Sequence, residues 1–539
     1  MKIVQTFWID NEENPLSSSF GWCSPKFHLM SWALSCLQLN KFYGDIELIT
    51  NSKGKEILID VLNLPYKRVR LELDEVIFNS KLWVLKKIYS YTLHNEPFLN
   101  IDGDVYIFKE LPPVLLSGEL ISQNIEEGFW YYNELLNLVN SDFDFVPSFL
   151  RYEQNNSNKN GANAGVLGGL NNEFFFNFYS IVNEFVIRNE NAISILDPNM
   201  IGRFNIFLEQ FFFYSLANKN NIEVKYLLKP VDDPGFDGYA NFHYLPNDIK
   251  FIHLLGDFKK NIWVCDQLSK RLFLNFPSFH SKIESIFLED FDFKSNSRGK
   301  IYDFYLSKII YNLKPEPFEN KLYEDFFRTL KILELYKVLP DNISSLNEET
   351  IFHLVESSKK IIKIDNFSHL IDDVFNFEVD KQKIINLLIN SEQIFLDNFK
   401  SFHTSNFTFS NNDWRTNSYF KLTSLAFWIE SKWDWAHNSF SSNIYNIDKI
   451  LKNFNQEPEY FVTILLLDSV NFNLIEYLLN PIEVFLLSSC YANQWISTNL
   501  VFEHAKCFFQ NLESDVIDST LEDSLRFLSY SGIIQFKYE

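Results

Sequence analysis

The sequence predicts an α/β domain at its amino-terminal side and a mainly helical region after it. Over roughly the first 270 of the 539 residues, strand-like and helix-like segments alternate. Such alternation is typical of a Rossmann-like, mostly parallel mixed sheet flanked by helices. From about residue 275 the pattern changes to long helical periodicity with few glycines. We therefore expect 1–275 to form the α/β domain, 276–330 a helical linker or packing segment, and 331–539 a mainly helical domain.

The strands of the first domain are expected where β-branched and aromatic residues dominate, and the helices where apolar residues recur every three to four positions. In chain order these segments are a strand at 2–9, a helix at 26–39, strands at 45–51 and 67–73, a helix at 80–94 and a strand at 97–102. Ligands of such sheets collect at the carboxyl ends of the strands. The residues that follow the strand at 97–102 are therefore candidates for a functional site.

The second region is marked by helical periodicity at 323–339, 349–364 and 380–399. Near the end of the chain, three helical segments precede Gly532 and a short strand. This pattern would suit a winged-helix-like module, although any three-helix bundle gives the same pattern. A winged helix would favour a peptide acceptor, since such modules often bind a peptide strand.

The bulk composition excludes several classes of function. The formal net charge is −22, which disfavours general binding to nucleic acid or anionic lipid. No apolar run is long enough to predict a membrane-spanning helix, and the first residues lead into a strand without a signal-peptide pattern. The five cysteines are scattered and never spaced C-x-x-C: they are Cys23, Cys36, Cys265, Cys490 and Cys507. We therefore expect neither a disulfide framework nor a zinc site, and we expect a cytoplasmic location.

Two carboxylates interrupt the apolar run "FLNIDGDVYIF" at 98–108. If the strand continues through them, Asp102 and Asp104 point to the same face and can aim at one cation. Gly103 would let a ligand approach the backbone between them. A divalent cation such as Mg²⁺ or Mn²⁺ would relieve the repulsion between the two carboxylates. Taken alone, the same three residues fit an ordinary turn equally well.

A second stretch, "FIHLLGDFKKNIW" at 251–263, places His253 after a short apolar strand, with Gly256 and Lys259 at intervals of three. His253 could supply a nitrogen ligand to the same cation, and mixed carboxylate and imidazole ligation favours Mn²⁺ over Mg²⁺. Gly256 would allow a phosphate to lie against the backbone and Lys259 would neutralise it. The alternative is a core histidine beside a surface lysine pair.

Together these motifs resemble the GT-A glycosyltransferases, in particular the retaining family 8 that contains glycogenin and galactosyltransferases. The resemblance rests on D-x-D at 102–104 and H-x-x-G-x-x-K at 253–259. Three further segments match in the expected order: the K-L segment, helix and strand of 81–108, the N-[AS]-G-V stretch of 163–170 and the D-Q helix of 208–217. The matches cover about half of the chain and place it on a remote branch of that family.

The resemblance implies a metal-dependent diphosphate site. Asp104 and His253 would be direct ligands of Mn²⁺, with Mg²⁺ as the alternative. Asp102 would contact the metal and the ribose of the nucleotide. The cation would bridge the phosphates of a UDP-sugar and stabilise departing UDP, while Lys259 and the backbone at Gly256 would act on the same oxygens.

The resemblance also implies a sugar site. Asn163, Ala164 and Gly165 would line the pocket for the donor sugar and acceptor. Gln210, with Glu209, would lie beneath the reactive carbon of the sugar and stabilise an oxocarbenium-like state. Glu209 stands where the family usually has Asp, and the following L-N is absent.

Two more residues are implied at the donor. Lys81 would reach the sugar or the diphosphate, although a solvated lysine in the first helical turn is the competing interpretation. Thr6 corresponds to the start of the family's T-N-x-x-Y nucleotide segment, which is here only "QTFWIDNEEN".

The sequence therefore predicts a hexosyltransferase that moves a sugar from a UDP-sugar to a glycan, glycolipid, peptide or protein acceptor, with retention of configuration. Two alternatives remain open. The first is a non-catalytic nucleotide-sugar or peptide binding protein on the same fold. The second is another metal-assisted enzyme of nucleotidyl transfer or phosphate-ester hydrolysis. The presence of Asp102, Asp104 and His253 argues against the first alternative.

Overall fold

The structure is a computed structural model that divides into two compact units, Met1–Asp292 and Phe293–Glu539. The described residues are 1–287, except 11–13, 15, 77, 80, 154–158, 233–241 and 243–249, and then 325–339, 347–364, 366–389, 413–436, 457–467, 474–490 and 494–538. Each unit is described by itself below.

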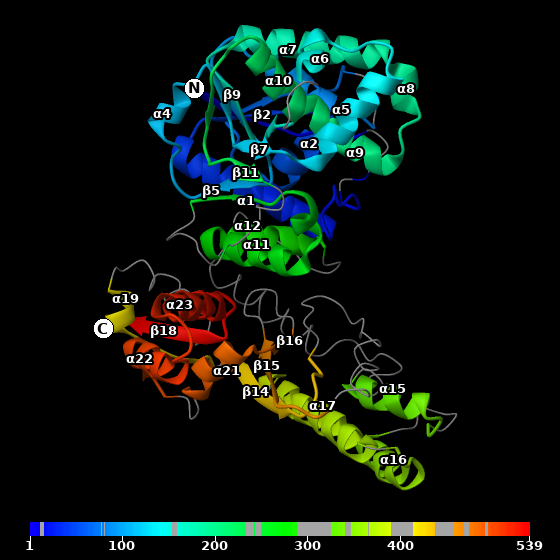
Figure 1. The fold of residues 1–539 in the computed structure, drawn as a ribbon, viewed down its shortest axis with the longest axis vertical. Helices are drawn as coiled ribbons and strands as arrows, with labels where there is room; N and C mark the ends of the chain where they lie inside the picture. The colour runs from blue at the N-terminus through cyan, green and yellow to red at the C-terminus, as the bar shows by residue number, and fades with distance from the viewer. Residues whose placement is uncertain are drawn as a thin grey trace. The chain divides into compact units, whose positions relative to one another are not determined.

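A mixed sheet of seven strands forms the centre of the first unit (Figure 1). Its order is β10-β6-β9-β4-β1-β2-β3, and β9 runs antiparallel to β4 and β6 while the other pairs are parallel. The strands are β1 (Lys2–Thr6), β2 (Ile46–Ile49), β3 (Arg68–Arg70), β4 (Phe98–Ile101), β6 (Leu120–Ser122), β9 (Val166–Gly169) and β10 (Val224–Tyr226). This sheet with flanking helices agrees with the α/β class that the alternating pattern predicts.

The strand order reverses between β1 and β4. From β1 the chain winds outward to β2 and β3, and it then crosses back to place β4 on the other side of β1. Ligands of open α/β sheets bind outside the carboxyl ends of the strands at such a reversal. Thr6 ends β1 and Asp102 follows β4, so the D-G-D motif lies at this position.

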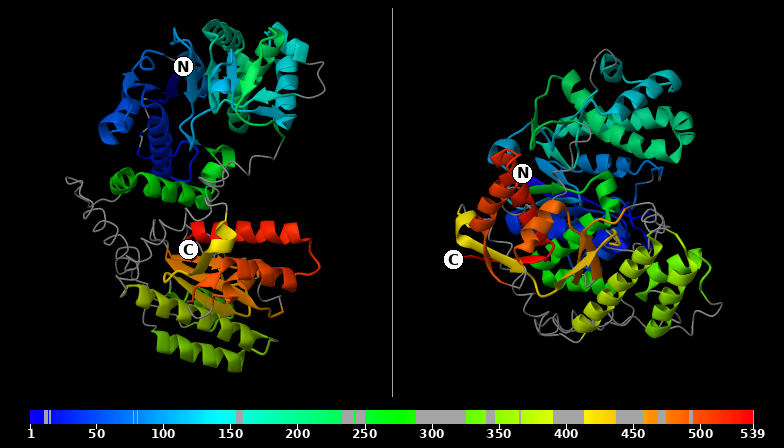
Figure 2. Two further views of the ribbon diagram at one scale, coloured as in Figure 1. Left: turned by 90° about the vertical axis from the view of Figure 1, so that its left-hand side faces the viewer. Right: turned by 60° about the horizontal axis from the view of Figure 1, so that its bottom comes forward.

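Helices cover both faces of this sheet, as Figures 1 and 2 show. α1 begins with Pro25 behind an extended Ser24 and ends at Gly44, whose φ of 63° suits a residue without a side chain. The main helices are α1 (Pro25–Tyr43), α3 (Val84–Tyr91), α5 (Trp130–Asp142), α7 (Asn172–Arg188), α9 (Pro198–Ile206), α10 (Phe212–Lys219), α11 (Ile262–Asn275) and α12 (Pro277–Ile286).

Phenylalanine dominates the largest core cluster of the first unit. The rings of α7, α9 and α10 and of the π-helical turn η2 (Phe207–Phe211) pack edge-to-face and stacked, for example Phe207 on Phe211 with centroids 4.9 Å apart. Burying such rings supplies much of the stabilisation of a core. This packing holds η2, which carries Glu209 and Gln210, in place.

Two small sheets complete the first unit. β12 (Phe251–His253) pairs antiparallel with β5 (Val105–Ile107), so that His253 lies opposite Val105. The other sheet joins β11 (Val231–Asp232), β7 (Ile125–Glu127) and β8 (Gly161–Ala162). The pairing of β12 with β5 therefore brings His253 next to the end of the D-G-D motif.

The second unit mixes helices with two three-stranded sheets. One sheet has the order β14-β15-β16 and the other β17-β13-β18, and all their pairs are antiparallel. The strands are β13 (Ser418–Leu422), β14 (Ala426–Ser431), β15 (Phe461–Leu467), β16 (Leu474–Leu478), β17 (Ile496–Ser497) and β18 (Ile534–Tyr538). The helices include α15 (Phe327–Leu335), α16 (Glu348–Ile361), α17 (Phe367–Ile389), α21 (Pro481–Ser488), α22 (Thr498–Phe508) and α23 (Ser514–Tyr530).

The expectation of a mainly helical 331–539 agrees with the helices of this region, but its described residues also contain the strands β13 to β17, which the sequence did not predict, besides the expected last strand. β15, "FVTILLL", is a short apolar run, and periodicity alone does not separate such a run from a buried helix. The three helices and last strand expected near the end are α21, α22, α23 and β18. The winged-helix interpretation stays a prediction.

The expected boundary at 275 also differs from the observed division after Asp292. α12 belongs to the first unit because its buried face packs against α1, where Lys26 forms an ion pair of 3.1 Å with the buried Glu284. In the rest of the expected linker 276–330, residues 288–324 lie outside the described residues, and α15 begins at Phe327.

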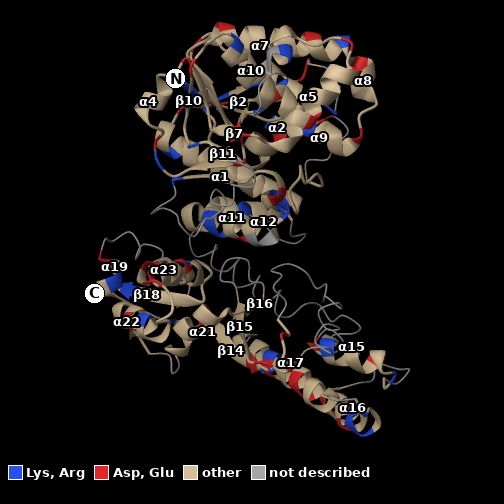
Figure 3. Ribbon diagram, viewed as in Figure 1, with Lys and Arg blue, Asp and Glu red and all other residues tan. Residues whose placement is uncertain are grey.

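Acidic and basic residues are interspersed over the helices of both units (Figure 3). Among the described residues, no helix has both the length and the apolar character needed to cross a membrane.

Candidate functional site

The D-G-D motif forms a turn between β4 and β5. β4 ends at Ile101, β5 begins at Val105, and the Val105 amide donates to the Asp102 carbonyl at 3.1 Å. The strand geometry that would aim both carboxylates at one point is therefore absent here. Instead, Asp102 and Asp104 face different partners. The two interpretations of this motif, an ordinary turn and a functional site, are therefore compatible.

Gly103 makes room for a side chain of the protein. A Cβ built on Gly103 would lie 2.4 Å from the Trp32 indole, and the Ser31 hydroxyl donates to the Gly103 carbonyl at 2.7 Å. The expectation that a ligand approaches the backbone at Gly103 is thus corrected, because Trp32 of α1 occupies that space. Trp32 holds the turn against α1.

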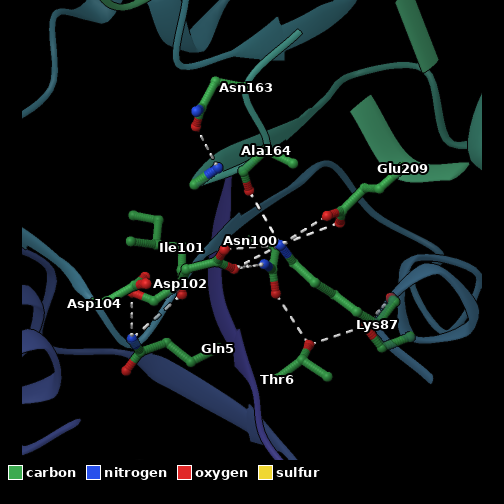
Figure 4. A network of polar contacts seen from close by, with 12 residues as sticks. Gln5, Thr6, Lys87, Asn100, Ile101, Asp102, Asp104, Asn163, Ala164 and Glu209 are labelled. Carbon is green, nitrogen blue, oxygen red and sulfur yellow. Dashed lines mark hydrogen bonds and ion pairs between the residues drawn. The ribbon is translucent and has the colours of Figure 1, made fainter. Parts of the chain in front are cut away.

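Asp102 bonds to Lys87 of α3. The Lys87 ammonium lies 2.8 Å from an Asp102 oxygen, 3.1 Å from Glu209 Oε1 and 3.2 Å from the Ala164 carbonyl (Figure 4). These three acceptors match the three N–H donors of a lysine. Burial alone would lower the pKa of Lys87, but Asp102 and Glu209 together raise it above its ordinary value. Lys87 therefore stays charged and joins three separate chain segments.

Glu209 is buried beneath this lysine and is 3% exposed. It also accepts a hydrogen bond of 2.5 Å from the Tyr91 hydroxyl. Its helix has a π-helical turn here, a feature often found at functional sites. The ion pair of Glu209 with Lys87 therefore positions Lys87 and, through it, Asp102.

Asp104 faces the second stretch of the sequence motif. The Lys259 ammonium lies 2.5 Å from Asp104 Oδ2, and His253 Nε2 lies 3.5 Å from Asp104 Oδ1. Burial would raise the pKa of Asp104, but the charge of Lys259 holds it well below its ordinary value. Oδ1 is buried and has no hydrogen-bond partner among the described residues. The carboxylate of Asp104 therefore favours its ionised form, and one of its oxygens has no hydrogen-bond partner among the described residues.

The hydrogen bonds of neighbouring amides define the orientation of His253. The Asn124 amide donates to the Ile125 carbonyl at 3.0 Å, so its oxygen accepts from the Gln123 amide at 3.1 Å. The Gln123 oxygen then lies 2.8 Å from His253 Nδ1, which must donate to it. In a neutral imidazole the lone pair is consequently on Nε2, the atom that faces Asp104.

Lys259 lies in the short 3-10 helix η5 (Gly256–Lys260), which begins just after β12. Gly256 has a φ of 53° and no atom within 4 Å of a Cβ built on it, so it permits the turn and leaves the backbone open. The spacing of His253, Gly256 and Lys259 therefore brings both the imidazole and the ammonium to Asp104.

The "NAG" stretch lies against the same histidine. Asn163 is 2% exposed, and its side-chain oxygen accepts from the Gly165 amide at 3.0 Å. The Gly165 carbonyl accepts from the Asp102 amide at 3.0 Å, and a Cβ on Gly165 would lie 2.4 Å from the His253 ring. Ala164 contributes its carbonyl to Lys87. The segment therefore connects Asp102 with His253 through its backbone.

Gln210 belongs to a separate polar cluster around Glu126. The Tyr132 hydroxyl lies 2.7 Å from the Gln210 oxygen and also contacts Glu126, which accepts from the Asn163 amide at 2.8 Å. Burial raises the pKa of Glu126, although the hydrogen bonds from Tyr132 and Asn163 oppose this rise. Glu126 thus bonds to Asn163 and is linked to Gln210 through the Tyr132 hydroxyl, and both Asn163 and Gln210 are among the residues expected around the sugar.

Thr6 and Lys81 differ in how they relate to this site. The Thr6 hydroxyl bonds with Ser90 at 2.9 Å and donates to Asn100 at 3.0 Å, so Thr6 is part of the network around Asp102. The Lys81 side chain is exposed, and its carbonyl accepts from Asn205 at 2.9 Å. The lysine that reaches the acids is Lys87 of α3, which begins only at Val84.

The residues present also limit what kind of metal site can form. Within the described part of the chain, no three His, Cys, Asp or Glu side chains gather closely enough to hold a metal ion. Of the expected set of Asp102, Asp104 and His253, Asp102 is paired with Lys87, and its role as a metal ligand stays a prediction. Asp104 Oδ1 and His253 Nε2 remain as two converging donors.

Comparison with known proteins places this domain in a family. Residues 1–286 match the model of a family of unknown function, DUF6734. The chain belongs to this family. No curated protein matches it. Among solved structures, the apo form of mouse xyloside xylosyltransferase 1 is 12% identical and covers 42% of this chain and 84% of its own, with a TM-score of 0.21.

At this TM-score the likeness carries no argument, so the function of the DUF6734 domain has to be inferred from its own side chains. Sequence reasoning missed three of them: Lys87, Gln123 and Glu126. Lys87 lies in α3, which begins after the expected Lys81, and a signal for Lys87 was its place on the buried face of that helix. Gln123 and Glu126 carry no motif, and only the paired strands show where they lie.

Proposed function

We propose that the DUF6734 domain is a metal-dependent glycosyltransferase whose donor is a UDP-sugar. The observation that carries this proposal is the pair formed by Asp104 Oδ1 and His253 Nε2. These atoms come from residues far apart in the sequence, lie 3.5 Å apart, and converge at the carboxyl end of the central sheet. Both carry lone pairs in the neutral-histidine arrangement, and Oδ1 is buried without a hydrogen-bond partner among the described residues.

Two protein ligands suit a divalent cation that is bound together with its substrate. Mg²⁺ and similar ions are commonly held by one or two carboxylates plus substrate phosphates and waters. The imidazole ligand favours Mn²⁺ over Mg²⁺. When bound, such a cation supplies Lewis-acid stabilisation to the charge of a departing diphosphate. We therefore assign Asp104 and His253 to the cation, with Gln123 fixing the histidine from behind.

The remaining residues would act on the donor itself. Lys259 would exchange its bond to Asp104 for one to a phosphate oxygen, because Asp104 then bonds to the cation. Asp102, held by Lys87 and 29% exposed at its side chain, would accept from a ribose hydroxyl. Asn163 and Gln210, both held through Glu126, would contact the sugar. Retention of configuration is proposed on the sequence resemblance alone.

The test is calorimetric titration of UDP into the full chain with and without Mn²⁺. We expect binding that depends on Mn²⁺ and that falls by more than about a hundredfold in Asp104→Asn, beyond the loss typical of an outer-shell change. The matched control is Asp257→Asn, an exposed aspartate of the same η5 segment that pairs with Lys260 at 3.0 Å. Binding that is indifferent to Mn²⁺ or to Asp104→Asn would contradict the proposal.

The reaction type needs its own measurement. Incubation with several UDP-sugars and Mn²⁺ should release UDP, and proton NMR of the sugar first released should show the anomeric configuration of the donor. Consumption of nucleoside triphosphates or phosphate esters, with UDP-sugars left intact, would instead support the nucleotidyl or phosphate-ester alternative. The acceptor stays a prediction.

A further inference from the structure

Two free cysteines meet beside the site although 242 positions separate them. The sulfur atoms of Cys23 and Cys265 lie 3.2 Å apart. Cys23 is exposed in the segment that leads into α1, and Cys265 is buried in α11. Neither residue takes part in the proposed transfer reaction.

Their contact is fixed through the backbone of Lys259. The Cys23 amide donates to the Lys259 carbonyl at 2.9 Å, and the Cys265 thiol donates to the same oxygen at 3.3 Å. The Trp22 ring lies with its centroid 5.9 Å from the Lys259 ammonium. Both cysteines therefore hydrogen-bond to the backbone carbonyl of the lysine whose side chain pairs with Asp104.

The two thiols have the complementary properties of an attacking and a resolving cysteine. The contact with the Cys265 thiol and the nearby charge of Lys26 lower the pKa of Cys23, against the opposing effect of burial. An exposed thiol with a lowered pKa is the kind that attacks disulfides. The buried partner in direct contact can then displace the first adduct.

We propose that Cys23 and Cys265 form a reversible disulfide on reaction with a low-molecular-weight disulfide such as oxidised glutathione. The Cys23 thiolate attacks one sulfur of the oxidant and releases one glutathione thiolate, which takes up the proton that Cys23 lost. Cys265 then attacks Cys23 Sγ, gives its proton to the second departing glutathione, and completes the bond. The protein loses two hydrogen atoms, and the oxidant becomes two thiols.

Closure requires a small movement at a sensitive place. The sulfurs must approach from 3.2 Å to the bond length of about 2.05 Å. That movement draws the Cys23 segment and the start of α11 together over the Lys259 carbonyl. The part of the inference that concerns ligand binding rests on the proposed function: a clamped Lys259 would stay with Asp104 and bind a diphosphate less well.

The experiment treats the full chain with oxidised glutathione, and then with reductant, and follows mass, thiols and binding. We expect the denatured thiol count to fall from the five cysteines of the chain to three, with a peptide that links the segments of Cys23 and Cys265. Reductant should restore all five. Cys23→Ser should abolish the loss, whereas Cys507→Ser, which removes another exposed cysteine, should leave the linked peptide unchanged.

The binding arm uses UDP with Mn²⁺ as the probe, and we expect a several-fold loss of affinity in the oxidised wild type that Cys23→Ser does not show. A lasting glutathione adduct on Cys23, or an unchanged thiol count, would overturn the disulfide. A linked peptide with unchanged affinity would overturn its coupling to Lys259. If UDP binds in neither state, the proposed function fails while the thiol count still decides the disulfide.

Discussion

Each unit of this protein buries a cation between two carboxylates, and the two clusters differ in what they leave unsatisfied. In the second unit, Arg328 bonds to Glu378 and Glu476, and all three are at most 5% exposed at their side chains. Backbone amides of residues 328 and 329 bond to the two oxygens of Glu378, and Lys381 bonds to the other oxygen of Glu476 at 2.7 Å. Every carboxylate oxygen there has a donor.

The first unit holds Lys87 in a similar way between Asp102 and Glu209, but this cluster opens toward the neighbouring Asp104. The Asp102 side chain is 29% exposed, and Asp104 Oδ1 is without a partner in the described structure. Leaving a buried acceptor unsatisfied costs free energy, and proteins tolerate it chiefly where a ligand completes the bond. The difference teaches that a buried ion pair does not by itself identify a ligand site. A buried acceptor without a hydrogen-bond partner, next to a partly exposed carboxylate, is the better indicator.

The largest expected effect comes from removing each central cation. Arg328→Met and Lys87→Met should each lower the free energy of unfolding by about 3–5 kcal/mol, because each leaves buried carboxylates without their counter-charge. Only Lys87→Met should also weaken binding of UDP with Mn²⁺, since Lys87 is the cation that pairs with Asp102. Denaturant titration measures the first effect and calorimetry the second.

The same pair of variants can break the comparison. If Lys87→Met bound UDP and Mn²⁺ as the wild type does, the first cluster would be as purely structural as the second. If Arg328→Met weakened that binding, the second cluster would contribute to the site, and the contrast between the units would fail.

A second prediction asks whether an unsatisfied buried atom always indicates a ligand. His94 is 1% exposed, stacks on Phe98 with centroids 4.4 Å apart, and has no hydrogen-bond partner for either nitrogen among the described residues. It lies in the core, and no carboxylate is bonded to it. We expect the burial of His94 to lower the stability of the fold without serving a function, in contrast with Asp104.

That cost should appear as a pH dependence. Burial lowers the pKa of His94 from 6.5 to about 3. Between these values the unfolded chain binds a proton that the folded chain does not, so stability is lost as the pH falls below 6.5. His94→Phe should remove this loss, and its stability relative to wild type should improve by about 2 kcal/mol between pH 8 and pH 5. A difference that is constant with pH would show that His94 is not buried as a neutral group.

The parts of this site that the sequence could predict are those encoded in short motifs. Asp104, His253 and Lys259 were expected together, and the structure brings them together because β12 pairs with β5. One detail was wrong: Gly103 makes room for Trp32, a long-range contact that no local pattern reveals. The pairing of Asp102 with Lys87 was not foreseen, and the role of Asp102 at a metal stays a prediction.

The strands of the second unit were missed for a related reason. β14 and β15 carry aromatic and aliphatic residues without clear alternation, because β15 is buried on both of its faces. A fully buried strand and a buried helix have the same composition over so short a length. Their identity is decided by pairing with β16, and pairing is a property of the whole unit.

The smallest expected effect concerns the cluster around Glu126. Tyr132→Phe should lower the free energy of unfolding by about 1 kcal/mol, because it removes one buried hydroxyl that bonds to Glu126 and Gln210. If Gln210 lies at the reacting carbon, the same change should lower kcat while the affinity for UDP stays the same. Tyr131→Phe, which removes a hydroxyl 3.2 Å from the same Glu126, is the matched control and should leave kcat unchanged. Equal kcat values in both variants would make this cluster structural, like the one around Arg328, and would limit the site to the acids, lysines and histidine at the end of β4.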